Sequence, residues 1–306
     1  MAAIELDGLT KRFGDVLAVD DFDLTVEEGE IFGFLGPNGA GKSTTIDILL
    51  DFTRPTDGTA TVLGYDAQKE SLAVRQRTGV LPDGYHVYDR LTGRRHLEFV
   101  VELKAVDEDV DALLERVGLA EAADRKAGGY SKGMRQRLVL AMALVGDPDL
   151  LILDEPSTGL DPNGAREMRE IIRRENERGT TIFFSSHIME QVEAICDRVA
   201  IINRGRLVAV DTVEGLRDAT ETSTTLSISV SNVDDALLET VAGLEGVTDV
   251  ALKEGRLRVV LSGGSKFDVL NTLDDAGADV GDFSVDESSL EDLFVRYTTE
   301  DQEVRA

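Results

Sequence analysis

The sequence predicts an α/β protein built on a mostly parallel sheet, with a smaller α+β domain after it. Three short segments, residues 30–35, 150–153 and 181–185, are almost wholly apolar, as are strands of a sheet that is buried on both faces. Helix-like stretches separate these segments, which favours parallel crossovers. Each segment ends in polar residues, and ligands bind at the carboxyl ends of parallel strands. The sequence therefore predicts a binding site at that edge of the sheet.

Residues 1–218 form the first predicted domain. Strand-like and helical segments alternate along it, and the stretch from Arg75 to about Ala127 reads as helical because apolar residues recur there at helical spacing. We therefore expect a helical subdomain at about residues 75–140. Residues 219–224 are polar and aperiodic, which predicts a linker.

Residues 224–306 form the second predicted domain. A half-buried strand is followed by a helix, a strand pair that turns at residues 254–255, a second helix, a short strand near Phe283 and a last helix at residues 288–297. The order β-α-β-β-α-β is that of a ferredoxin-like sandwich.

The composition limits the possible partners. The 306 residues include 59 Asp and Glu against 32 Lys and Arg, a formal charge of −27, and 42% of them are hydrophobic, enough for packed cores in two domains. A surface this acidic repels phosphodiester backbones, so we expect no nucleic-acid partner. Any phosphate that the protein binds must lie in a local positive pocket.

The acidity also suggests a salty environment. The basic residues are 24 Arg and only 8 Lys, and at 1 M salt a Debye length of about 3 Å screens self-repulsion. A halophilic source is our hypothesis, and an acidic mesophilic protein is the alternative.

Several features favour the cytoplasm. Cys196 is the only cysteine, which excludes an intramolecular disulfide and a thiol-based metal site. The first residues do not form a signal peptide, and the longest apolar run, residues 138–145, is far short of the roughly 20 residues that span a bilayer. We expect a soluble chain inside the cell.

Residues 36–43 carry the strongest motif. The run G-P-N-G-A-G-K-S fits G-x-x-x-x-G-K-[ST] between a strand and a predicted helix at 44–50, the context of a P-loop. Backbone N–H groups surround phosphates there, Lys42 reaches the β- and γ-phosphate oxygens, and the Ser43 hydroxyl can bind Mg²⁺. A plain glycine-rich turn would leave Lys42 and Ser43 unexplained. The predicted nucleotide-binding residues here are Gly36, Pro37, Asn38, Gly39, Ala40, Gly41, Lys42, Ser43 and Thr44.

Two carboxylates and a histidine follow the other two strands. Asp154 is placed to hold the Mg²⁺ shell, as a Walker-B carboxylate does. Glu155 can accept the proton of the attacking water, and His187 can hydrogen-bond the γ-phosphate or orient the water and Glu155. Either carboxylate could instead be a helix N-cap, and an isolated histidine is more often structural. With Lys42, Glu155 and His187 form the predicted catalytic set.

This order of motifs resembles the ATP-binding cassette family, the nucleotide-binding subunits of ABC transporters, over residues 4 to about 215. Residues 130–138, Y-S-K-G-M-R-Q-R-L, look like the family signature, usually L-S-G-G-Q. Ser131 and Gly133 are retained, in a form similar to the ABC-2 exporter branch. Ser131 can also N-cap the following helix and leave N–H groups free for an anion. The resemblance implies that this element contacts the γ-phosphate held by another cassette, so that a head-to-tail dimer encloses two ATP molecules.

Further site residues follow from the resemblance. Asp161 matches the D-loop aspartate, His187 the switch histidine, and Phe13 the aromatic residue that stacks on adenine. On periodicity alone, Phe13 is instead an ordinary core residue. Asp83, in T-G-V-L-P-D, stands where the family usually has Gln. The Asp83 carboxylate can accept a hydrogen bond from a Mg²⁺-bound water, although it lacks the amide donor of Gln. We therefore retain Asp83 as a predicted residue of the metal site.

A second string, L-S-G-G-S at residues 261–265, copies the usual signature more literally than residues 130–138 do. It lies in the second predicted domain, downstream of the Walker-B strand. We interpret it as a strand-to-helix turn.

Together the motifs predict an ATPase that binds ATP and Mg²⁺ and powers export through separate permease subunits. Residues 288–294, S-S-L-E-D-L-F, resemble the extension of ABC-2-type exporter ATPases, which favours export over import. The expected partners are a second copy or a paralogous cassette and the permease at the inner face of the membrane. The alternatives are a soluble ABC ATPase acting on ribosomes or DNA and a non-hydrolysing regulatory module. A single unsplit cassette and an intact catalytic set count against them.

Overall fold

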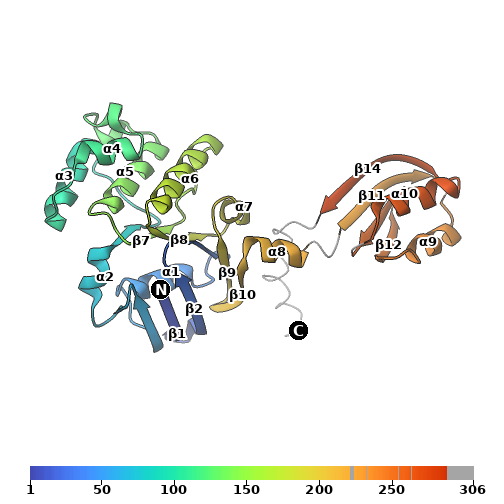
Figure 1. The fold of residues 1–306 in the computed structure, drawn as a ribbon, viewed down its shortest axis with the longest axis horizontal. Helices are drawn as coiled ribbons and strands as arrows, with labels where there is room; N and C mark the ends of the chain where they lie inside the picture. Colours follow the sequence, from blue (N-terminus) through green and yellow to red (C-terminus); the bar gives the residue numbers. More distant parts are fainter. Residues whose placement is uncertain (221–223, 232, 254, 263, 288–306) are drawn as a thin grey trace. The chain divides into compact units, whose positions relative to one another are not determined.

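The computed structural model describes residues 1–220, 224–231, 233–253, 255–262 and 264–287. The chain forms two compact units that divide between Thr212 and Val213 (Figure 1). Helix α8 (Val213–Thr220) therefore belongs to the second unit, although we had counted most of it in the first domain and its last two residues in the linker. The rest of the predicted linker, residues 221–223, and the predicted helix at 288–297 lie outside the described residues.

A six-stranded sheet contains the three strands that the sequence predicts. Its order is β10–β9–β3–β8–β7–β6, with the bounds Arg206–Thr212, Arg198–Asn203, Ile31–Leu35, Thr181–Ser186, Leu150–Asp154 and Thr78–Leu81. Neighbouring strands are parallel except for β10, which is antiparallel to β9. Every residue of β3, β7 and β8 is buried, which explains their continuous apolar runs.

The structure corrects the helical interpretation of Arg75 to Ala127. Helix α2 (Ser71–Arg77) already ends at Arg77, and the next element along the chain is strand β6, not a helix. Four residues are too few to show a period of two. A Cβ at Gly79 of β6 would lie 2.3 Å from the Ala143 carbonyl oxygen, so glycine is what allows the close approach of α5. The helical part proper consists of α3 (Gly93–Lys104), α4 (Val110–Arg116) and α5 (Lys132–Leu144), with 3₁₀ turns η1 (Ala120–Ala122) and η2 (Ala127–Gly129).

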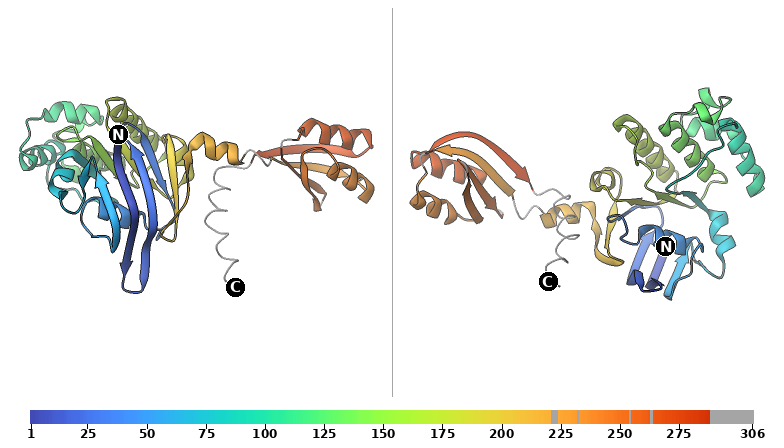
Figure 2. Two further views of the ribbon diagram at one scale, coloured as in Figure 1. Left: turned by 60° about the horizontal axis from the view of Figure 1, so that its bottom comes forward. Right: turned by 180° about the vertical axis from the view of Figure 1, so that it is seen from behind.

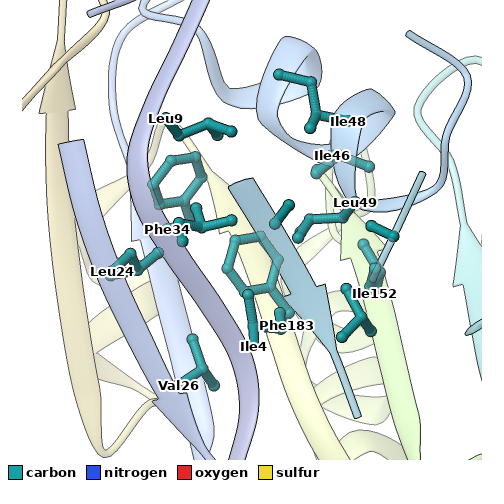
Figure 3. Packing of buried hydrophobic residues seen from close by; sticks show 14 of the residues in the cluster. Ile4, Leu9, Leu24, Val26, Phe34, Ile46, Ile48, Leu49, Ile152 and Phe183 are labelled. Atoms are coloured by element: carbon teal, nitrogen blue, oxygen red, sulfur yellow. The ribbon is translucent and has the colours of Figure 1, made fainter. Parts of the chain in front are cut away.

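A second, antiparallel sheet of the first unit did not emerge from the sequence. Its order is β2–β1–β4–β5, with the bounds Val16–Glu27, Ala2–Phe13, Asp57–Val62 and Tyr65–Asp66, and Figure 2 shows the long β1–β2 hairpin in blue. Helix α1 (Lys42–Leu49) shares one core with both sheets (Figure 3). In that core the rings of Phe34 and Phe183 lie 5.3 Å apart, centroid to centroid. The core thereby fixes the start of α1 beside the ends of β3 and β8.

Two helices complete the first unit, α6 (Pro162–Glu177) and α7 (Met189–Glu193). Each connects two strands of the parallel sheet, α6 between β7 and β8 and α7 between β8 and β9. None of the helices in the described part of the chain has the length and hydropathy needed to span a bilayer.

The second unit contains the predicted ferredoxin-like arrangement. Its antiparallel sheet has the order β12–β13–β11–β14, and helices α9 and α10 contribute to its core. Counted along the chain, the strand order is 2-3-1-4. Strand β14 has nine residues where we expected a short strand. The bounds are β11 Thr224–Ser231, α9 Asp235–Ala242, β12 Val247–Lys253, β13 Arg256–Leu261, α10 Lys266–Asp275 and β14 Asp279–Glu287.

Candidate active site

The P-loop connects β3 to α1, and two of its glycines are required by close backbone contacts. Gly41, the N-cap of α1, has φ 112°, which only glycine adopts without strain. A Cβ at Gly41 would lie 2.5 Å from the Ala18 carbonyl oxygen, and one at Gly36 would lie 2.4 Å from the Ile202 carbonyl oxygen. The loop can therefore press against β2 and β9, and it holds the first turn of α1 at the carboxyl edge of the parallel sheet.

Lys42 is the first residue of α1, and its side chain is buried. Its ammonium donates to the Gly36 carbonyl oxygen at 2.6 Å and lies 3.6 Å from Glu155 Oε1. Burial lowers the pKa of Lys42, while the nearby carboxylates of Glu155 and Asp154 act in the opposite direction. The ammonium also donates to the Pro37 carbonyl oxygen at 3.4 Å, so it is held by two carbonyls and one carboxylate, each of which a phosphate oxygen can replace as acceptor.

Ser43 and Asp154 bring two oxygen ligands together from α1 and β7. The Ser43 hydroxyl donates to Asp154 Oδ2 at 3.4 Å. Burial raises the pKa of Asp154, and the negative charges of Asp83 and Glu155 raise it further. A divalent cation would relieve this crowding of negative charge.

The donor set fits Mg²⁺ better than a metal held by the protein alone. Within the described ranges, no group of three or more His, Cys, Asp or Glu side chains has the arrangement of a dedicated metal site. Mg²⁺ is commonly bound through one or two protein oxygens together with waters and substrate phosphates. Ser43 and Asp154 supply oxygens of that kind beside the P-loop.

Glu155 is held in an unusual conformation. Its φ of 52° is left-handed, which costs a non-glycine residue roughly 1–2 kcal/mol. Its backbone N–H donates to the Ser185 carbonyl oxygen at 3.1 Å, and Thr158 Oγ1 donates to Oε2 at 3.1 Å. His187 Nδ1 lies 2.8 Å from Oε1. Neither carboxylate after β7 is a helix cap, because α6 begins at Pro162 with Asp161 as its N-cap. Non-glycine residues with a left-handed backbone conformation cluster at functional sites.

Lys42, Ser43, Asp154 and Glu155 line one cavity of about 370 Å³, whereas Thr158 and His187 are not among its lining residues. Asp83 reaches it because the last residue of β6, Leu81, pairs with Leu153 of β7, so both strands end at the same edge. A second cavity of about 570 Å³ shares Asp83, Asp154 and Glu155 and extends to Lys132 of α5. The walls of the first cavity are residues 16–18, most of the P-loop, the first residues of α1, Asp83, Asp154, Glu155 and Arg204.

Phe13 lies at the end of β1, where it pairs with Val16. Its ring is 50% exposed and has Lys11 Nζ 4.7 Å from its centroid, so it is not a core residue. Val16 lines the cavity of the P-loop. The ring is therefore near the mouth of that cavity and free to contact a ligand.

Ser131, Gly133 and Asp161 lie outside the cavity that the P-loop lines. Ser131 is the N-cap of α5 and accepts from the Met134 N–H at 3.2 Å, as we expected. Asp161 caps α6. The two segments adjoin each other, since a Cβ at Gly159 would lie 2.1 Å from the ammonium of Lys132. The structure thus brings the predicted signature and the predicted D-loop together.

The literal signature string of the second unit lies between β13, which ends at Leu261, and α10, which begins at Lys266. Ser265 is the N-cap of α10 and accepts from the Asp268 N–H at 3.3 Å. This is a strand-to-helix connection, as we interpreted it.

Sequence reasoning missed three parts of the site. Thr158, which donates to Glu155, lies between the predicted catalytic Glu155 and the predicted D-loop residue Asp161, so its hydroxyl could have been noticed. Residues 16–18 and Arg204 carry no local pattern, because contacts between distant segments bring them to the cavity: Gly41 packs against Ala18, and the Gly205 N–H donates to the Ala40 carbonyl oxygen.

The fold and the site define a P-loop nucleotide triphosphatase, with a phosphate-binding loop after β3 and acidic residues after the parallel strand β7. A family model described as ABC transporter matches residues 19–158. Another, described as ATP-binding protein DrrA1-3-like, C-terminal domain, matches residues 212–298.

Relatives extend the match along the chain. The linearmycin resistance ATP-binding protein LnrL of Bacillus subtilis is 33% identical over 304 residues, 96% of this chain and 98% of that protein. The Nod factor export ATP-binding protein I of Burkholderia lata is 43% identical over 214 residues, 68% of this chain and 70% of that protein. A solved ATP-binding subunit of an ABC transporter is 28% identical with a TM-score of 0.64, over 71% of this chain and 92% of that one. The chain belongs to the ATP-binding proteins of ABC transporters, and it is an ATPase of the DrrA-like type.

Ser131 and Ser262 offer a test of which string is the signature. We expect Ser131→Ala to lower ATP turnover by about tenfold or more, since it removes the N-cap hydroxyl at the start of α5 and a donor for phosphate. Ser262→Ala, in the second unit, should leave turnover unchanged. Phosphate release at saturating ATP measures both. The reverse result would move the signature to residues 261–265.

Proposed function

We propose that this ATPase uses Lys42, Glu155 and His187 as catalytic residues and powers export through a separate permease. The observation that carries the catalytic assignment is the contact of both Lys42 and His187 with Glu155 Oε1, at 3.6 Å and 2.8 Å. The start of α1 and the segments after β7 and β8 converge on this one oxygen. A regulatory module without hydrolysis would not require that convergence.

Each catalytic side chain has a defined task in this proposal. Lys42 exchanges the Gly36 carbonyl oxygen for phosphate oxygens of ATP, which neutralises charge on the transferred phosphoryl group. Glu155 accepts a proton from the attacking water. His187 donates from Nδ1 to Glu155, which orients the carboxylate and the water beside it.

The remaining residues of the cavity bind the nucleotide. Within the P-loop segment from Gly36 to Thr44, the residues that line the cavity offer backbone N–H groups to the phosphates at the start of α1; they are Asn38, Gly39, Gly41, Lys42, Ser43 and Thr44. Phe13 stacks on the adenine at the cavity mouth. Ser43 and Asp154, with Asp83 beside them, hold Mg²⁺, which supplies positive charge to the β- and γ-phosphates.

Ser131, Gly133 and Asp161 serve the nucleotide of another cassette. They lie at the starts of α5 and α6, outside the cavity of their own P-loop. A second copy or a paralogous cassette, placed head to tail, would present its ATP to them. In this arrangement the serine-capped start of α5 offers its backbone N–H groups to that nucleotide.

Export rather than import is supported by the names of the relatives. One confers linearmycin resistance and the other exports Nod factor. We propose the same direction here, with the chain bound to a permease at the cytoplasmic face of the membrane. Exposed apolar side chains for such a contact lie on the first unit, among them Phe52, Leu72, Phe99 and Leu103.

Glu155→Gln tests the catalytic assignment. Gln keeps the size of the side chain but cannot accept the proton, so kcat should fall by about a hundredfold or more while ATP still binds. Phosphate release and equilibrium binding of ATP measure the two effects. Glu170→Gln is the matched control, because Glu170 is exposed on α6 and pairs only with Arg166 among the described residues. Unchanged turnover in the Glu155 variant would contradict the assignment.

We further propose that the protein comes from a halophile. Its formal net charge is −27, and the excess negative charges repel one another unless salt screens them. The melting temperature should then rise by roughly 5 °C or more between about 0.1 M and about 2 M KCl, a few kcal/mol of relieved repulsion. Calorimetry or circular dichroism measures this shift. A melting temperature that does not rise with KCl contradicts a halophilic source.

A further inference from the structure

Arg204 lies in the turn between β9 and β10, beside the P-loop. Two backbone hydrogen bonds fix the turn: the Gly205 N–H donates to the Ala40 carbonyl oxygen at 2.8 Å, and the Asp20 N–H donates to the Gly205 carbonyl oxygen at 2.8 Å. Arg204 itself has φ 48°, which is uncommon for a non-glycine residue. The turn is therefore a fixed wall of the nucleotide cavity, tied to the P-loop on one side and to β2 on the other.

The guanidinium of Arg204 is not engaged in the structure. Arg204 is an exposed residue that lines the cavity, and no hydrogen bond or ion pair joins its guanidinium to the residues that the structure describes. Two residues further on, Arg206 pairs with Asp20 at 2.5 Å. An exposed arginine without a partner among the described residues, beside a phosphate-binding loop, is available to an anionic ligand.

Arg204 and Lys42 line the same cavity from different elements. Lys42 is held at Glu155, 3.6 Å from its carboxylate. The turn of Arg204 instead packs on β2, where a Cβ at Gly205 would lie 2.9 Å from the Ala18 carbonyl oxygen. Residues 16–18 line this part of the cavity, and Val16 pairs with Phe13. When the γ-phosphate of a nucleotide lies at Lys42 and its base lies near Phe13, the α-phosphate, which is next to the ribose, lies between them beside Arg204.

We propose that Arg204 binds the α-phosphate of the nucleotide, as a cation additional to Lys42 and the P-loop; this inference rests on the proposed function of the cavity. The planar guanidinium offers two parallel N–H donors that match two phosphate oxygens. ATP and ADP share the α-phosphate, so Arg204 contributes equally to both. Its loss raises KM and Kd and leaves kcat unchanged.

Three variants of the full chain test this assignment. Arg204→Asn removes the charge and tolerates a positive φ, Arg204→Lys keeps the charge, and Arg206→Asn removes one equal charge from the same hairpin outside the cavity. If Arg204→Asn disturbs the turn, Arg204→Gly, which adopts φ 48° freely, replaces it. Competition against a fluorescent ADP analogue gives Kd for ADP, CDP and a non-hydrolysable ATP analogue, and phosphate release gives kcat and KM.

We expect Arg204→Asn to weaken all three nucleotides by the same factor, about tenfold, as for the loss of one charge-assisted hydrogen bond. Arg204→Lys should recover most of this affinity, and Arg206→Asn should bind as the unmodified chain does.

Unchanged affinity in Arg204→Asn overturns the inference. A loss confined to the ATP analogue would place the contact at the γ-phosphate, and a loss for ADP but not CDP would place it at the base; either result overturns the α-phosphate assignment. Failure of the unmodified chain to bind any nucleotide would instead refute the proposed function.

Discussion

The contact between Lys42 and Glu155 is the interaction on which the rest of the site depends. It joins the start of α1 to the end of β7 across the carboxyl edge of the sheet, and His187, after β8, meets the same carboxylate oxygen. A buried ammonium requires an acceptor, and here the acceptors are groups that phosphate can replace. The core of Phe34, Phe183 and α1 holds these elements in register (Figure 3). The packing of this hydrophobic core therefore determines the distance between the ammonium of Lys42 and the carboxylate of Glu155.

The acidity of the chain gives this contact its importance. Asp83, Asp154 and Glu155 gather at one cavity, and the pKa of Asp154 is raised by its burial and by its acidic neighbours. Only fixed cations and backbone N–H groups make such a place attractive to a polyphosphate. Lys42 and Arg204 are the two cationic side chains among the residues that line the cavity. The exterior repels polyanions in general, and in our proposal the cavity takes up one that brings its own divalent cation.

The sequence was informative where function and local pattern coincide. The runs that end at Leu35, Asp154 and Ser186 are buried on both faces, so their apolar character is continuous and could be read directly. Strand β6 was missed because its four residues show no period, and Gly79 serves a contact with α5 that lies far away in the sequence. The antiparallel sheet and Arg204 were missed for the same reason, since contacts between distant segments bring them to the site, that of Ala18 with Gly41 and that of Gly205 with Ala40. Motifs thus predicted the chemical centre, whereas the walls of the cavity needed the tertiary structure.

The central question is whether ATP replaces the internal partners of Lys42. A crystal structure of the chain with a non-hydrolysable ATP analogue and Mg²⁺ answers it most directly. We expect the ammonium of Lys42 about 2.8 Å from a β- or γ-phosphate oxygen, with its bond to the Gly36 carbonyl oxygen broken. A structure in which the nucleotide binds elsewhere, or in which Lys42 keeps its contacts with Gly36 and Glu155, would contradict this view of the site.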